Sequence, residues 1–291
     1  MKPLGGFDLI RPRTIAGVLE IMSSLETAQV IAGGTDMIPV FRDIGCKPEH
    51  LIELTTVQEL NGIFEEKENI LIGPTTTHTQ LLESNIVKEK LSALWEGCSV
   101  LGSVQIRNRG TIGGNICNAS PAADTAPGLI VHGTELHIGS LREIKWVPIE
   151  NFFVGPKITI LNPNEIVIGF RIPIPPENSG SAFQRIGRRN GFCLSIVNCA
   201  TYLERDGQKV NESRIALGSV GPTPMRIVDA EKVIKGKKFD EKMIAEAAAI
   251  CMETIKPIDD IRGSADYRKD MTAVLVKRTL STAWRRTGGA F

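Results

Sequence analysis

The sequence predicts an α+β protein of two domains, and three observations support this. The chain has 291 residues, which is enough for two hydrophobic cores. Short β-type runs alternate with helical spacing before residue 173. Prolines at 173, 175 and 176, followed by residues 177–180, interrupt every regular pattern. We therefore place a domain boundary between residues 176 and 177.

The elements of the first part follow from capping residues and hydrophobic spacing. Thr14 can cap a helix that carries Ile15, Val18, Leu19 and Met22 on one face. The further elements expected in chain order are a strand at 29–32, a brief continuation at 37–41, a strand at 51–54, a hairpin of 59–64 with 69–72, a helix from Thr79, a helix over 86–101 and β-rich runs over 129–174.

The second part has strands first and helices afterwards. Strands are expected near residues 181–186, 195–204 and 213–220, and helices over 229–235, 240–256 and 265–286. This order is typical of a small α+β domain.

Composition and motifs exclude several classes of protein. The formal net charge of +1 favours neither nucleic acid nor an anionic membrane as a partner. The six cysteines are scattered without a C-x-x-C pair, which argues against a zinc ribbon or an iron–sulfur cluster in this chain, and the four histidines lack metal-ligand spacing, so no metal site is expected. Unpaired cysteines, no signal-peptide pattern and no membrane span predict a cytoplasmic protein. The G-x-G-x-x-G, G-x-x-x-x-G-K and G-x-S-x-G motifs are absent.

Residues 110–124 are the most unusual stretch of the chain. They read G-T-I-G-G-N-I-C-N-A-S-P-A-A-D and contain no Lys, Arg or Glu. Glycine lets the backbone approach a ligand closely, and Thr, Asn and Ser add short hydrogen-bonding groups. This composition suits a loop that wraps a phosphate group with N–H donors.

A second stretch of the same character lies about eighty residues earlier. Residues 30–36 read V-I-A-G-G-T-D, a short apolar run that ends in two glycines. A strand followed by Gly-Gly is a common way to bring backbone amides to a phosphate. Two such loops suggest one diphosphate held from two sides, although the first alone could also be a tight turn.

Together these stretches resemble the FAD-binding medium subunit of the molybdenum hydroxylases. The motifs are A-G-G-T-D at 32–36, T-I-G-G-N at 111–115 running into N-A-S-P-A-A-D, and L-G-S-V-G-P-T-P-M-R at 217–226. The resemblance implies an FAD-binding domain over 1–176, built of two α/β subdomains that divide near residues 55–60 and similar to the vanillyl-alcohol-oxidase flavoproteins. It implies a smaller α+β C-terminal domain over 177–291, with an antiparallel sheet and helices.

The resemblance also implies a set of FAD-binding residues. They are Val30, Ile31, Ala32, Gly33, Gly34, Thr35, Asp36, Met37, Leu101, Thr111, Ile112, Gly113, Gly114, Asn115, Asp124, Val167 and Gln184.

Several of these residues have a second interpretation. Asp36 would repel a phosphate, so we expect it to fix the first loop by accepting backbone N–H bonds. Asp124 either accepts from ribityl or ribose hydroxyls of FAD or caps a helix. Leu101 and Val167 are either FAD contacts or core residues, and Val30, Ile31 and Ala32 combine core with pocket wall. Gln184 stands where some relatives have a Lys, which removes a positive charge.

Two groups outside this set are also of interest. Arg188, Arg189, Phe192 and Cys193 lie near where the family brings residues to the flavin ring, and Phe192 is either a ring contact or a core aromatic. The last predicted helix is basic, which indicates either a solvated face or a docking surface for an acidic partner.

The resemblance implies electron transfer without a catalytic residue of the protein, because the flavin performs the redox chemistry. A large partner subunit would carry the molybdenum cofactor, and a small one would carry two-iron two-sulfur clusters. FAD in this chain would collect the electrons and pass them to an acceptor, with NAD expected. The alternatives are a stand-alone FAD-dependent oxidoreductase that acts on a small substrate, and a scaffold that has lost FAD. The substrate of the complex is not encoded here.

Overall fold

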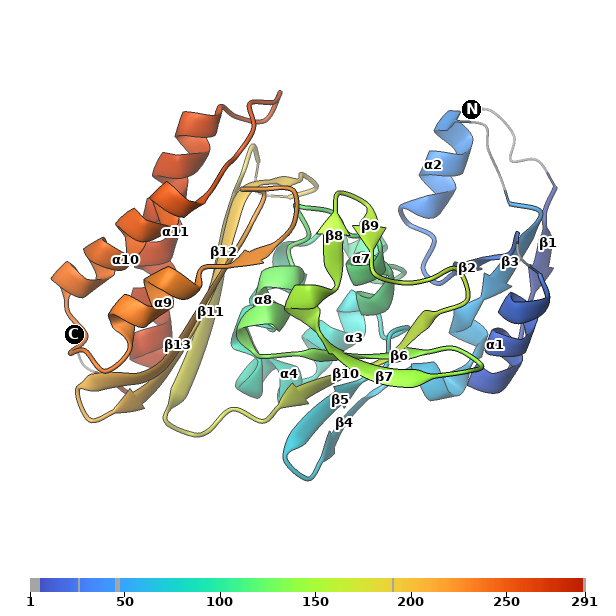
Figure 1. The fold of residues 1–291 in the computed structure, drawn as a ribbon, viewed down its shortest axis with the longest axis horizontal. Helices are drawn as coiled ribbons and strands as arrows, with labels where there is room; N and C mark the ends of the chain where they lie inside the picture. Colours follow the sequence, from blue (N-terminus) through green and yellow to red (C-terminus); the bar gives the residue numbers. More distant parts are fainter. Residues whose placement is uncertain (1–5, 26, 45–47, 190, 290–291) are drawn as a thin grey trace.

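The structure is a computed structural model that describes residues 6–289 except 26, 45–47 and 190. Three sheets follow one another along the molecule (Figure 1). The first is parallel, in the order β1-β3-β2, with two helices beside it. Its elements are β1 (Asp8–Ile10), α1 (Ile15–Ser24), β2 (Gln29–Ile31), α2 (Met37–Ile44) and β3 (His50–Glu53).

The middle sheet is antiparallel, in the order β4-β5-β10-β6-β7, and helices lie on one side of it (Figure 1). Its strands are β4 (Ile63–Glu66), β5 (Asn69–Ile72), β6 (Glu135–Gly139), β7 (Ile144–Pro148) and β10 (Ile166–Pro173). The helices are α3 (His78–Glu83), α4 (Asn85–Lys90), α5 (Ser92–Val100), α6 (Val104–Arg107), α7 (Ile112–Cys117) and α8 (Ala126–Val131). The short 3-10 helices are η1 (Leu54–Thr56), η2 (Gln58–Leu60) and η3 (Ile149–Asn151), and β8 (Phe153–Gly155) with β9 (Ile158–Thr159) forms a separate hairpin.

The third sheet is antiparallel, in the order β11-β12-β13-β14. Its elements are β11 (Ser179–Gly187), β12 (Ser195–Asp206), β13 (Lys209–Gly218), β14 (Met225–Arg226), α9 (Val228–Ile234), α10 (Glu241–Thr254) and α11 (Ala265–Arg286). Helix α11 packs on β11 and β12, while α5 and α8 of the middle part also contact this sheet. The third sheet is therefore covered by helices from both parts of the chain (Figure 1).

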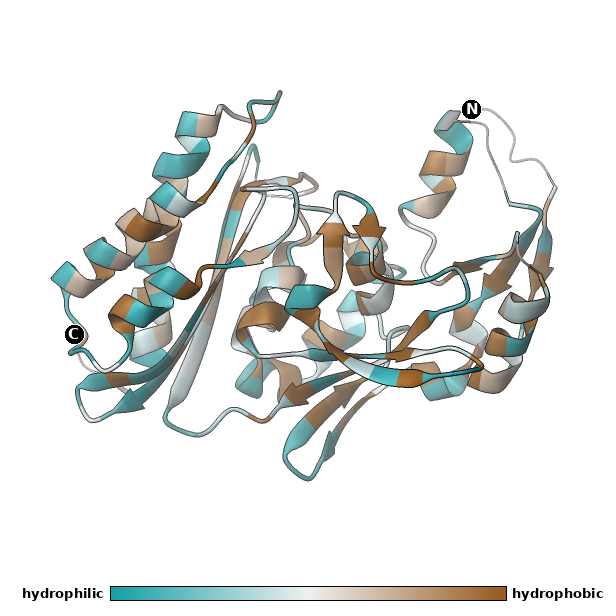
Figure 2. Ribbon diagram, in the orientation of Figure 1, coloured by the Kyte–Doolittle hydropathy of each residue, from teal (hydrophilic) through white to brown (hydrophobic). Residues whose placement is uncertain are grey.

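Three buried clusters form the cores, and the interior strands are correspondingly apolar (Figure 2). The largest lies between the middle sheet and its helices, and it includes Phe183, Ala200, Tyr202 and Ala216 from the third sheet. The second lies between the third sheet and α9, α10 and α11. The largest core, between the middle sheet and its helices, thus continues across the proposed domain boundary.

Most expected elements are present, and local side chains explain where they begin. Thr14 accepts a hydrogen bond from the Gly17 N–H and caps α1 as predicted. A reciprocal capping box of Thr77 and Gln80 starts α3. The three strands and three helices of the C-terminal part also lie where they were expected.

Several expectations were wrong in detail. Residues 129–131, expected in a β-rich run, are the end of helix α8. The helix predicted over 86–101 is two helices that break at Leu91, where φ is −122°. The segment 37–41 belongs to helix α2, and the first half of the hairpin predicted at 59–64 begins only at Ile63 because residues 58–60 form η2. Leu91, Leu94 and Cys98 of the segment 86–101 are buried as expected, whereas Val40 and Phe64 of the other two segments are exposed, so periodicity alone identified neither the backbone geometry nor the burial there.

Candidate cofactor-binding site

The two glycine loops lie against each other, backbone to backbone. A Cβ on Gly33 would be 2.1 Å from the carbonyl oxygen of Arg109, so only glycine fits there. A Cβ on Gly110 would be 3.4 Å from the Thr35 hydroxyl oxygen. The fold therefore brings together the two loops that the sequence pointed to.

The second loop is the capped beginning of helix α7. Thr111 is the N-cap, and its hydroxyl accepts from the Gly114 N–H at 3.1 Å. The amides of Ile112 and Gly113 donate to the carbonyls of Thr76 and Pro74 at 2.9 and 2.8 Å. These donors are already used, although the sequence had suggested that they face a phosphate. Gly113 serves close packing, because a Cβ there would be 2.6 Å from the Pro74 carbonyl oxygen.

The first loop supplies the open donors. Within the described part of the chain, the N–H groups of Gly34, Thr35 and Asp36 have no hydrogen-bond acceptor. They belong to the turn that leads into helix α2, and Gly34 has φ of +71°, which disfavours any side chain. Free amides at the start of a helix are the usual setting of a bound phosphate. The residues present therefore fit the diphosphate of a dinucleotide.

The other members of the first loop line its base. Val30 packs against the core of the first subdomain, and Ile31, Ala32 and Met37 are half-buried. The Asp36 carboxylate lies 3.1 Å from the Lys157 ammonium group. The expectation that Asp36 accepts backbone N–H bonds is not met among the described residues, because this lysine takes its place.

Asp124 is the centre of a buried polar cluster. It is 5% exposed, and its two oxygens lie 2.7 Å from Arg185 Nη1, 2.5 Å from Ser195 Oγ and 2.9 Å from Asn198 Nδ2. Burial raises the pKa of Asp124, while Arg185 and the two hydrogen bonds oppose that shift. Asp124 does not cap a helix, since the N-cap of α8 is Thr125.

Gln184 lies on the other face of strand β11. Its neighbours Ala182 and Ile186 belong to the core beneath α10 and α11, whereas Phe183 belongs to the core of the middle part. Side chains alternate along a strand, so Arg185 rather than Gln184 faces Asp124. Strand β11 thus carries a positive charge at Arg185, paired with Asp124, on the face opposite to Gln184.

The remaining site residues fall in two places. Leu101 ends α5, and the adjacent Gly102 carbonyl accepts from the N–H of Phe192 at 3.1 Å, which joins this turn to the β11–β12 loop. Phe192 is 61% exposed, so it is not a core aromatic. Val167 is buried in the main core and pairs with Ile138, while β5 pairs with β10 only from Phe170 onward. The Val167 side chain therefore belongs to the core, and its backbone is not paired with strand β5.

Sequence reasoning missed Lys157, Ser195 and Asn198 and passed over Arg185. Alternation along β11 and β12 could have placed Arg185 and Asn198 on a common face, but their contact with Asp124 depends on how the sheets pack. The position of Lys157 had no signal in the sequence.

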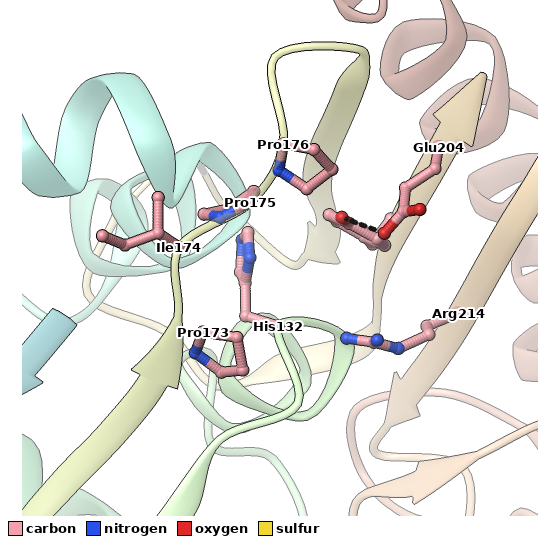
Figure 3. A pocket seen from close by; sticks show the side chains of 8 residues that line it. His132, Pro173, Ile174, Pro175, Pro176, Glu204 and Arg214 are labelled. Carbon is pink, nitrogen blue, oxygen red and sulfur yellow. Dashed lines mark hydrogen bonds between the residues drawn. The ribbon is translucent and has the colours of Figure 1, made fainter. Parts of the chain in front are cut away.

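The described residues bear on two further kinds of site, metal sites and pockets. They contain no cluster of His, Cys, Asp or Glu that could hold a metal ion. A pocket of about 110 Å³ lies at the 173–176 linker, between His132, Tyr202, Glu204 and Arg214 (Figure 3). No residue of the two glycine loops lines this pocket. The Tyr202 hydroxyl donates to Glu204 of the same strand at 2.7 Å, and Arg214 donates to the Val131 carbonyl, which joins the C-terminal part to the middle part.

The fold and the paired loops define a class of protein, an α+β protein in which two glycine loops meet beside open backbone amides. Family comparisons specify the class. Residues 5–175 match the FAD binding domain in molybdopterin dehydrogenase, and residues 181–283 match the CO dehydrogenase flavoprotein C-terminal domain.

Individual relatives agree over nearly the whole chain. The carbon monoxide dehydrogenase medium chain of Hydrogenophaga pseudoflava is 32% identical over 281 residues, covering 96% of this chain and 98% of the relative. The xanthine dehydrogenase FAD-binding subunit of Escherichia coli O157:H7 is 31% identical, covering 96% of each. The solved carbon monoxide dehydrogenase of H. pseudoflava superposes with a TM-score of 0.94, covering 98% of this chain and 99% of that one.

The chain belongs to the FAD-binding medium subunits of the molybdenum hydroxylase family. Its cofactor is FAD. No helix of the described residues is both long and apolar enough to cross a membrane.

Proposed function

We propose that this chain transfers electrons within a molybdenum hydroxylase complex. A small partner subunit with two-iron two-sulfur clusters delivers electrons to the FAD of this chain, and a large partner subunit with the molybdenum cofactor oxidises the substrate. NAD is the proposed acceptor of the electrons, and the cytoplasm, where the cysteines stay reduced, is the proposed location. Relatives named as medium chain and FAD-binding subunit support the multisubunit assignment.

The observation that carries the proposal is the meeting of the two loops around open amides. We propose that Gly34, Thr35 and Asp36 donate their N–H groups to the diphosphate of FAD. Residues 111–115 form the opposite wall, where Gly114 is exposed and Asn115 is half-buried. Bound FAD supplies the electron-carrying chemistry, and the chain supplies binding and orientation.

The remaining predicted contacts lie toward the flavin end. We propose that Leu101 and Val167 contribute backbone, and that Asp124 with Arg185 forms the polar wall beside the ribityl chain. The loop that carries Phe192 is proposed to approach the flavin ring, because its aromatic side chain is exposed and tied to the turn after Leu101.

A visible absorption spectrum of the purified protein tests the proposal, with the released cofactor identified by chromatography and NADH added without oxygen. We expect FAD that NADH bleaches. If FAD is bound but stays oxidised after NADH is added, the cofactor site stands and NAD is not the acceptor. Turnover of a small substrate by the chain without partners would favour the stand-alone oxidoreductase.

A further inference from the structure

Lys157 connects three segments that are far apart in the sequence. Its Nζ lies 3.1 Å from Asp36 Oδ2 of the first loop and 2.6 Å from Asn118 Oδ1, just after α7. Its own N–H donates to the carbonyl of Ala119 at 2.9 Å. The residue lies between β8 and β9, in the hairpin beside α7 (Figure 1).

The backbone around Lys157 is held in an uncommon conformation. Lys157 has φ of +64° and Ala119 has φ of +45°, a region that residues other than glycine rarely adopt. The hydrogen bond between these two residues fixes the base of the lysine side chain next to the loops. At Lys157 this conformation belongs to the two-residue turn between Gly155 and Ile158, so the turn sets the direction in which the lysine side chain leaves the hairpin.

The ion pair with Asp36 does not explain why a lysine stands at this position. The side chains of Lys157 and Asp36 are 54% and 55% exposed, and ion pairs at such exposure contribute little to stability. An ammonium group has three hydrogens, and two of them are directed to Asp36 and Asn118. Solvent or a ligand can therefore reach this cation.

The two loops contain no positively charged side chain of their own. Residues 30–37 carry one charged side chain, Asp36, and residues 111–115 carry none. A diphosphate held by these loops would meet neutral amides and one carboxylate. A nearby positive charge would offset part of this negative charge, and Lys157 is in contact with Asp36 itself.

We propose that Lys157 is a phosphate ligand of this site, whose ammonium group binds the diphosphate of FAD and neutralises Asp36. The proposal rests on the placement of FAD at the two loops. It assigns a role to the β8–β9 hairpin, which presents one cation to both loops. If Lys157 served only to fasten the loops, Asp36 would be an equal partner in the same bond.

Three variants separate these roles. Lys157→Asn removes the charge and keeps a residue that tolerates positive φ. Lys157→Arg keeps the charge, and Asp36→Asn removes the protein partner of Lys157. Lys232→Asn is the matched control, because Lys232 is another exposed lysine in an ion pair, with Asp229 on α9.

The measurement is the dissociation constant of FAD, from flavin fluorescence, for the chain alone and in complex with its partner subunits. Lys157→Asn should weaken FAD binding about 10- to 100-fold, the effect of losing one charge-assisted hydrogen bond. Lys157→Arg should bind within a few fold of wild type, and Asp36→Asn should bind FAD no more weakly than wild type. Added NaCl should weaken FAD binding to wild type more than to Lys157→Asn.

Two results would overturn the proposal. One is a Lys157→Asn variant that is folded by circular dichroism and binds FAD within twofold of wild type. The other is an Asp36→Asn variant as weak as Lys157→Asn, which would show that the ion pair only fastens the loops. A wild-type protein that binds no FAD in either preparation would instead refute the placement of the cofactor.

Discussion

The glycines of the two loops have different tasks, and this difference can be tested residue by residue. Gly33 is in backbone contact with Arg109, whereas a Cβ on Gly114 would meet only the Thr111 hydroxyl, at 3.0 Å. Gly33→Val should therefore separate the loops and destabilise the fold. Gly114→Val should leave a folded protein that no longer binds FAD, because the branched side chain stands in the cofactor space.

Thermal unfolding and FAD content of the two variants check this prediction. Gly33→Val should lower the melting temperature by several degrees, as expected for a loss of a few kcal/mol. Stoichiometric FAD in a folded Gly114→Val protein would show that the second loop is not a wall of the site.

Two buried histidines predict how stability depends on pH. Burial lowers the pKa of His78 to about 4 and that of His132 to about 3, while the unfolded chain titrates near 6.5. The unfolded state therefore binds more protons below pH 6.5. Stability is complete above that pH and falls as the pH drops toward 4, by about 1.4 kcal/mol per pH unit for each histidine.

Urea unfolding at several pH values measures this slope. His132→Leu should remove about half of it, and the loss of both ring nitrogens, which have no partner among the described residues, should cost little stability at pH 7. An unchanged slope in this variant would mean that other groups govern the acid side.

Residue identity was predictable where chemistry is local and unpredictable where it depends on packing. The loop glycines were identified because their composition is unusual for a surface segment. The resemblance led to Gln184 and left Arg185 unmentioned, because a resemblance fixes the sequence position and not the face of the strand that carries the side chain. Lys157 was missed because its contacts with Asp36 and Asn118 are long-range, and no motif around residue 157 indicates them.

At the scale of the elements, strands and long helices followed from periodicity, while short helices did not. α11 was predicted with its observed bounds because 22 residues give a long signal. α7 has six residues, including two glycines, and was predicted as a loop. Tertiary bonds from Ile112 and Gly113 to the 74–76 segment stabilise it, and these bonds have no local pattern.

The joint between α8 and the third sheet depends on the Asp124–Arg185 pair. Both side chains are about 6% exposed, so Asp124→Ala would leave a buried guanidinium group without its carboxylate. We expect a loss of about 3–5 kcal/mol in the free energy of unfolding. The double variant Asp124→Leu with Arg185→Met should be less destabilised than Asp124→Ala, since it leaves no buried charge.

Denaturant unfolding combined with FAD binding separates the two roles of Asp124. Asp124→Asn that is as stable as wild type but has lost FAD would make the carboxylate a cofactor ligand and not a structural anchor. Asp124→Asn that loses stability and retains FAD would support the anchor alone.

At the scale of the whole molecule, we propose domains over 1–176 and 177–291, with the first divided near residues 55–60. The change from the parallel first sheet to the antiparallel middle sheet supports the inner division, and the 173–176 linker supports the outer one. The domains are nevertheless closely joined. Asp124 binds three residues of the C-terminal part, and the Ala93 N–H donates to the Ser181 hydroxyl at 3.0 Å.

This shared core predicts that the two domains depend on each other. A fragment of residues 1–176 would expose the apolar surface that covers Phe183, Ala200 and Tyr202 and would lose the partners of Asp124. It should aggregate or bind FAD weakly by itself, whereas co-expression with 177–291 should restore FAD binding. The intact chain should unfold in one transition, followed by circular dichroism and flavin fluorescence together. A monomeric 1–176 fragment with full FAD affinity would show that the cofactor site is complete without the third sheet.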